Sequence, residues 1–73
     1  MDLFEELRRL RAEIAKENGV PPYIVFSDKS LHDMCSLLPR KREDMLLVHG
    51  VGETKYERYG AEFLNVIGQW SAS

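Results

Sequence analysis

The sequence predicts an all-α fold, a compact orthogonal bundle of about five short helices. Apolar residues recur at helical spacing in several segments, and no segment shows the alternation of apolar and polar residues that is typical of strands. None of the expected helices is long enough to be stable alone, so they must share one core. The chain has 73 residues. We therefore expect a single small domain over 1–73, with its core over about 3–70 and a flexible tail at 71–73.

The first helix is expected over about 3–17, where an apolar stripe at helical spacing runs along the segment. Asp2 is a good N-cap residue, and Glu5 follows three positions later, as in a capping box. Asn18 and Gly19 tolerate the left-handed backbone that ends many helices. The stripe consists of Leu3, Leu7, Leu10 and Ile14.

Residues 20–26, VPPYIVF, are expected to form an extended connector that includes one tight turn at most. Its two prolines lack amide donors and bias the residues before them to extended geometry. The side chains expected to hold the connector on the core are Ile24, Val25 and Phe26.

The second helix is expected over about 29–37. Ser27 and Asp28 are good N-cap residues, and Pro39 stops the helical run. The apolar positions at helical spacing in this segment are Leu31, Met34, Cys35 and Leu38.

Three more short helices are expected over about 41–47, 53–59 and 61–69. Gly60 is expected to end the second of these three. Trp70 continues the apolar stripe of the last helix, so we expect it to close the bundle against the first helix rather than to anchor a partner. The inward side chains of these helices are expected to be Met45, Leu46, Val48, Phe63, Leu64, Ile67 and Trp70.

Composition excludes several classes of protein. The formal net charge is −2, so nucleic-acid binding would need a local cationic patch. Cys35 is the single cysteine and cannot form an internal disulfide, which favours a reducing, intracellular setting. No apolar run approaches the roughly 18 residues of a membrane span, and no signal peptide opens the chain, so we expect a soluble protein without a membrane partner.

No catalytic or metal-binding constellation stands out. His32 and Cys35 lie three residues apart, but His49 is the only other soft ligand, and Cys35 belongs to the apolar stripe. No phosphate-binding loop of the nucleotide-hydrolase type is present. We therefore expect no enzymatic activity, no metal and no cofactor.

The segment VHGVGETKYERYG contains two glycines around one apolar residue. Gly50 and Gly52 permit positive φ and leave backbone amides uncovered by side chains. Because amides before a helix start are positively polarised, this turn can accept a phosphate oxygen, and Lys55 and Arg58 lie on the helix that follows. The same glycines can instead serve only to reverse the chain direction.

Three motifs carry a family resemblance over residues 3–67. They are L-R-x-L-R in the first helix, VPPYIVFSD in the connector and GVGxxKxERYGxxFL near the end. In this order and spacing they resemble the HRDC domain, the C-terminal module of RecQ-type helicases and RNase D, and the connector looks closest to bacterial RecQ. The glycine turn also resembles the helix-hairpin-helix element of DNA repair proteins.

The resemblance implies a bundle of about five helices with a non-catalytic accessory role. It implies weak binding of single-stranded or structured DNA and adjustment of helicase substrate affinity, with ATP hydrolysis elsewhere in a longer chain. It also implies a bacterial cytoplasmic location at the nucleoid, and we expect the isolated domain to be a monomer.

The resemblance assigns a DNA-binding role to a small set of residues. Tyr23 occupies the aromatic position of the PPY motif, where an exposed ring on a rigid connector is a platform for base stacking, although a core position is the alternative. Lys55 and Arg58 match the basic positions of the last motif. The alternative for them is a surface ion pair, of Lys55 with an acid on the first helix or of Arg58 with Glu62. The full candidate set is Tyr23, Lys55, Arg58, Gly50, Gly52, Lys29 and Lys41.

Acidic neighbours leave a second function open. Glu53 and Glu57 lie among the candidate cations, so about three neutralised phosphates would give a salt slope of only about −2.7. The alternative is an acidic interaction module that contacts the helicase's own core domains or a partner protein rather than DNA. A purely structural spacer is a third class.

Overall fold

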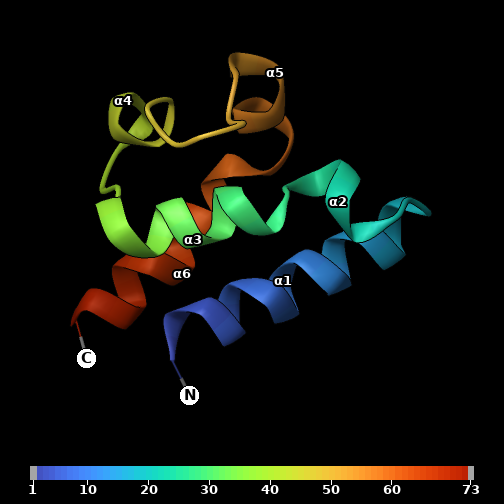
Figure 1. Ribbon diagram of the computed structural model, residues 1–73, viewed down its shortest axis with the longest axis horizontal. Helices are drawn as coiled ribbons and strands as arrows, with labels where there is room; N and C mark the ends of the chain where they lie inside the picture. The colour runs from blue at the N-terminus through green and yellow to red at the C-terminus, as the bar shows by residue number, and fades with distance from the viewer. Residues whose placement is uncertain (1, 73) are drawn as a thin grey trace.

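The protein was analysed as a computed structural model, which describes residues 2–72. These residues contain helices and turns but no strand, so the predicted all-α class is confirmed (Figure 1). The elements are α1 (Leu3–Asn18), α2 (Pro22–Val25), α3 (Asp28–Leu37), α4 (Arg42–Met45), α5 (Glu53–Lys55), the π-helical η1 (Tyr56–Gly60) and α6 (Ala61–Ala72).

The helices pack around one core. α1 packs against α2, α3 and α6, while α4 packs against η1. Figure 1 shows α4 and α5 together at one end of the molecule, and the start of α1 and the end of α6 together at the other end. The predicted orthogonal bundle is therefore confirmed.

Aromatic rings from separate elements meet in the middle of the core. The ring of Phe26, which follows α2, packs edge to face against Phe63 of α6 at a centroid distance of 4.9 Å and against Tyr59 of η1 at 6.1 Å. Edge-to-face pairs of this kind stabilise beyond their buried area. The other buried apolar residues are Leu3, Leu7, Ile14, Ala15, Val25, Leu31, Met34, Pro39, Met45, Val48, Val51 and Ile67.

The ends of α1 and the start of α3 follow the predicted capping. Asp2 accepts a hydrogen bond from the Glu5 amide at 2.9 Å, and Gly19 adopts the left-handed conformation with φ 65°. Ser27 caps α3 by accepting a hydrogen bond from the Ser30 amide at 3.2 Å. These caps were predictable because each depends on residues close in sequence.

The predicted extended connector was wrong in part. Residues 22–25 form the one-turn helix α2, because Pro22 occupies the first helical position, where its missing amide hydrogen costs nothing. Val25 and Phe26 are buried as expected, but Ile24 is 41% exposed and does not hold the connector on the core. The turn of helix points Ile24 away from the side that carries Val25.

The predicted break at Gly60 was also wrong. α5, η1 and α6 form one continuous helical run, and the residue after Gly60 has helical backbone angles. Gly60 is needed for space, since a Cβ atom there would overlap the ring of Tyr56. The predicted total of about five helices still holds, with α2 gained and the two expected C-terminal helices joined.

Smaller differences concern the third and last helices. α4 covers only Arg42–Met45, and Leu46 is half-buried rather than inward. Trp70 is 38% exposed and therefore closes the bundle only in part. α6 includes Ser71 and Ala72, which we expected in the tail, and Ser73 lies outside the described residues.

Arg11 is a buried charge that the sequence pattern did not reveal. Its guanidinium donates a hydrogen bond to the carbonyl oxygen of Phe26 at 3.0 Å and pairs with the carboxylate of Asp28 at 2.8 Å. These contacts tie α1 to the chain between α2 and α3. They fix the segment from which the candidate site is built.

Candidate nucleic-acid interface

Tyr23 is presented on the outside of the molecule by α2. Its side chain is 67% exposed, while the neighbouring Val25 and Phe26 are fully buried and hold the turn in place. The predicted exposure of this ring is confirmed. Its role in stacking stays a prediction.

Lys55 lies beside the end of α2. Its ammonium nitrogen is 6.0 Å from the centroid of the Phe26 ring, three residues after Tyr23 in the sequence. This is cation–π range. Within residues 2–72 no carboxylate lies at ion-pairing distance from Lys55, so the alternative of a pair with an acid on α1 is not found.

The glycine turn is fastened to α3 by two hydrogen bonds to His49. The hydroxyl of Ser30 donates to the His49 carbonyl oxygen at 2.6 Å, and the His49 amide donates to a carboxylate oxygen of Asp33 at 2.8 Å. Gly50 follows with φ 76°, and a Cβ atom there would lie 2.7 Å from the Ser30 hydroxyl. Both the backbone angle and the space therefore require glycine at this position.

Gly52 does not adopt the positive φ that the sequence led us to expect. Its φ of −97° is accessible to any residue, and a Cβ atom there would meet nothing within 4 Å. Gly50 and Gly52 are both exposed, and in the described part of the chain neither amide has a hydrogen-bond acceptor. Both amides are thus open to an external acceptor.

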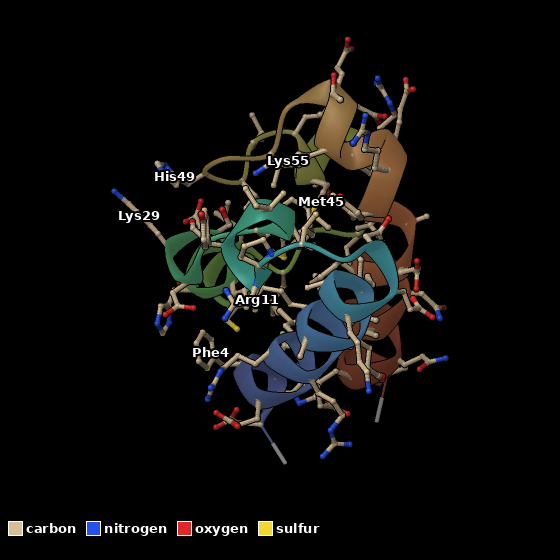
Figure 2. The ribbon with its side chains drawn as sticks, turned by 90° about the vertical axis from the view of Figure 1, so that its right-hand side faces the viewer. Phe4, Arg11, Lys29, Met45, His49 and Lys55 are labelled. Carbon is tan, nitrogen blue, oxygen red and sulfur yellow. The ribbon has the colours of Figure 1, made fainter. Side chains whose placement is uncertain are left out.

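Three basic side chains point to the same side of the molecule: Lys29 of α3, His49 of the turn and Lys55 of α5 (Figure 2). Contacts along residues 26–30 explain why they lie on one side of the molecule. The ammonium of Lys55 lies over the ring of Phe26, and the hydroxyl of Ser30 donates to the backbone of His49. Lys29 lies between Phe26 and Ser30 in sequence. We call Lys29, His49 and Lys55 the basic face.

Two predicted residues are not joined to the basic face by any contact within residues 2–72. Lys41 precedes α4 and lies 3.9 Å from a carboxylate oxygen of Glu43. Arg58 is exposed on η1, and the described residues show no ion pair between it and Glu62. Their DNA-binding roles stay predictions.

The residues 2–72 contain no group of three or more metal-ligating side chains. His32 stacks on the ring of Phe4 at a centroid distance of 4.2 Å, and Cys35 is half-buried against the core. Burial, followed by the charge of Asp2, raises the pKa of the Cys35 thiol. This environment is the opposite of the one that activates a nucleophilic cysteine.

We therefore expect Cys35 to react slowly with alkylating reagents. A raised pKa means a smaller thiolate fraction at every pH below it, and the thiolate is the reactive form. Mass spectrometry of iodoacetamide-treated protein at mildly alkaline pH should show slower labelling than for free cysteine. Unfolding in urea should bring the two rates together. A folded-state rate equal to that of free cysteine would contradict this environment.

No helix within residues 2–72 is both long enough and apolar enough to cross a membrane.

These features define a small all-helical domain with one basic face. The family model of the HRDC domain matches residues 1–67, and the chain belongs to the HRDC-domain family. The predicted resemblance is thereby confirmed. A solved structure, HRDC domain 3 of D. radiodurans RecQ, has the same fold, with a TM-score of 0.89 and 37% identity over 93% of this chain and 90% of that one.

Curated relatives are DNA helicases. The chain is 48% identical over 66 residues to the ATP-dependent DNA helicase RecQ of Bacillus subtilis and 44% identical over 71 residues to that of Haemophilus influenzae. It is 35% identical over 66 residues to the ATP-dependent DNA helicase UvrD2 of Mycobacterium tuberculosis. The matches cover 90%, 97% and 90% of this chain but only 11%, 12% and 9% of the relatives, in which the matched part is an accessory domain.

Proposed function

We propose that the chain is a non-catalytic accessory domain that binds single-stranded or structured DNA weakly and without sequence specificity. In this proposal it adjusts the substrate affinity of a RecQ-type helicase in the bacterial cytoplasm and acts as a monomer. The observation that supports the proposal most is the exposed ring of Tyr23 on the turn that leads into the basic face. Within residues 2–72, neither Lys29 nor Lys55 is neutralised by an ion pair.

Each part of the site has a physical role in this proposal. Tyr23 stacks on a base, which every base permits because each has a π-face. Lys29 and Lys55 contact phosphates, and the open amides of Gly50 and Gly52 donate hydrogen bonds to a phosphate oxygen. Lys41 and Arg58 are further phosphate contacts for a strand that continues beyond the basic face.

The charges limit the strength of binding. Single-stranded DNA contributes a salt slope of about −0.7 per contacted cation, so a short strand that contacts only Lys29 and Lys55 gives about −1.4 at neutral pH. The net charge of −2 opposes association at longer range. Binding is therefore expected to be measurable at low salt and weak at physiological salt.

Replacing Tyr23 with alanine tests the proposal. Stacking contributes about 1–3 kcal/mol per base, so Tyr23→Ala should weaken binding of a labelled single strand about five- to 150-fold at low salt. Tyr23→Phe keeps the aromatic face and should bind nearly as wild type. Fluorescence anisotropy titration measures all three affinities.

A matched control for this test is Leu47→Ala. Leu47 is 76% exposed and belongs to neither α2 nor the basic face, so its loss should leave DNA affinity unchanged. Equal affinities for wild type and Tyr23→Ala would remove Tyr23 from the interface. Equal losses for Tyr23→Ala and Leu47→Ala would show that the effect is not one of stacking.

A groove between α1 and α6 favours protein contact as a second candidate function. Its lining includes the carboxylates of Glu6 and Glu13, the guanidinium of Arg9 and the apolar side chains of Leu10 and Val66, so acidic groups outnumber basic ones there. Among the described residues neither carboxylate has a cationic partner at ion-pairing distance. A basic side chain with an apolar stem, from the helicase core domains or a partner protein, fits such a lining.

The two candidate functions predict opposite results. If contact with the helicase core is the sole function, the isolated chain should not bind DNA. Deletion of the domain should nevertheless change the DNA affinity of the whole helicase. DNA binding by the isolated chain that depends on Tyr23 excludes protein contact as the sole function. A structural spacer would give no effect in either measurement.

A further inference from the structure

We propose that His49 is an additional phosphate-contacting residue and that its protonation strengthens DNA binding at the basic face. This inference rests on the proposed function and deepens it. The imidazole is exposed and points to the same side as the ammonium groups of Lys29 and Lys55 (Figure 2). The sequence pattern did not assign it, because His49 precedes the glycine motif and has no regular spacing to the candidate cations.

The backbone of His49 is held rigidly for this role. Its carbonyl oxygen and its amide are both hydrogen-bonded to side chains of α3, at 2.6 Å from Ser30 and 2.8 Å to Asp33. The next residue, Gly50, has the positive φ that turns the chain away from α3. Because the turn is fixed before binding, only the side-chain rotation of His49 is lost when it contacts a phosphate.

The surroundings of His49 leave its ring free for an anionic ligand. In the described structure no carboxylate forms an ion pair with the ring. The carboxylates of Asp33 and Asp44 accept backbone N–H groups, and those of Glu43 and Glu53 pair with cations. The charged groups on the elements that meet at the turn are Asp28, Lys29, His32 and Asp33 of α3, Arg42, Glu43 and Asp44 of α4, and Glu53 and Lys55 of α5.

Histidine is the side chain whose charge changes between about pH 5 and 8, whereas carboxylates and DNA phosphates stay ionised there. Protonation of His49 therefore adds a third cation to the basic face. It should steepen the single-strand salt slope by about 0.7, from about −1.4 to about −2.1. The contact is solvent-exposed, so the expected gain in affinity is about two- to fivefold.

A second histidine, His32, allows a matched experiment. A fluorescein-labelled oligothymidylate is titrated at low salt with wild type, His49→Asn, His32→Asn and His49→Lys, at about pH 5.5 and about pH 7.5. Thymine has no group that titrates in this range. His32 stacks on Phe4 and is distant in sequence from the turn, so His32→Asn is the control for histidine protonation elsewhere.

Wild type and His32→Asn should bind about two- to fivefold more tightly at the lower pH, and His49→Asn should lose that gain. His49→Lys should bind at the higher pH as wild type does at the lower pH, because its charge is permanent. The backbone hydrogen bonds of residue 49 remain in every variant, and circular dichroism verifies the fold.

The inference is overturned if His49→Asn keeps the pH dependence of wild type, or if His32→Asn loses it. Either result would leave the proposed function intact, provided that binding at the higher pH still depends on Tyr23. Absence of binding by wild type at both pH values overturns the proposed function and this inference together.

Discussion

Replacing Phe26 with alanine should lower the free energy of unfolding by about 3–5 kcal/mol. The ring is fully buried between Phe63 and Tyr59, so truncation opens a cavity that the surrounding helices cannot fill without moving. A 73-residue domain has a total stability of only roughly 4–11 kcal/mol. The substitution is therefore expected to remove from roughly a quarter to all of the folding stability, as measured by urea denaturation followed by circular dichroism.

Ile24→Ala is the matched control for this prediction. Ile24 lies two residues earlier and is 41% exposed, so its truncation should change stability by well under the Phe26 value, about 0.5–1 kcal/mol. A Phe26→Ala protein as stable as Ile24→Ala would show that the aromatic cluster does not organise the core. The Phe26 variant should also lose the position of Lys55, whose ammonium lies over the ring.

Replacing Gly60 with alanine should also destabilise the fold, by about 1–3 kcal/mol. On helix propensity alone, alanine should be better than glycine by up to about 1 kcal/mol. Steric overlap with the Tyr56 ring decides the sign, since that ring must shift and the Arg42 guanidinium lies 5.7 Å from its centroid. Each kcal/mol corresponds to a fall of about 4–8 °C in Tm for a domain of this size.

Gly68→Ala supplies the opposite outcome in the same helix. A Cβ atom at Gly68 would meet nothing within 4 Å, so this change should raise stability by about 0.4–1 kcal/mol. The double variant Gly60→Ala/Tyr56→Ala tests the cause. Without the Tyr56 ring, Gly60→Ala should no longer lower the free energy of unfolding relative to the single variant Tyr56→Ala. If Gly60→Ala proves as stable as Gly68→Ala, the contact with Tyr56 is not tight.

Features set by near neighbours in sequence were predictable. The caps at Asp2, Gly19 and Ser27 follow from residue types that complete hydrogen bonds within one turn. The apolar stripe of the first helix likewise identified Leu3, Leu7 and Ile14 as core residues. The fold class needs little more than these periodicities.

The errors arose where one residue type has two uses. Pro22 excludes a helix interior but suits a helix start, and only the packing of Val25 and Phe26 decides that a turn of helix forms. Glycine suits a helix end, but it also lets another group approach the backbone closely. At Gly60 the ring of Tyr56, four residues earlier, lies where a Cβ atom would be. Spacing alone does not separate such cases.

The candidate site shows the same limit. The exposure of Tyr23 was predictable from the apolar residues that follow it, which already provide the anchor. That Lys29, His49 and Lys55 lie on one side of the molecule was not predictable. Their placement depends on contacts between residues far apart in sequence, namely between Phe26 and Lys55 and between Ser30 and His49. Arg11 was missed for a similar reason, since its partners Phe26 and Asp28 lie beyond its own helix.

The wide π turn of η1 sets the phase of the helix on either side of it. Such a turn contains one residue more than an α turn, and each residue of an α-helix advances the direction of the side chain by about 100°. Lys55 and Phe63 therefore face directions that a regular helix of the same length would not give them. Deleting one residue within η1 would let the run close as a regular α-helix with Lys55 and Phe63 in nearly the same relative directions, because the π turn completes about one rotation with one residue more than an α turn. The π turn can accordingly absorb a change of one residue in chain length without changing which side chains of α6 pack the core.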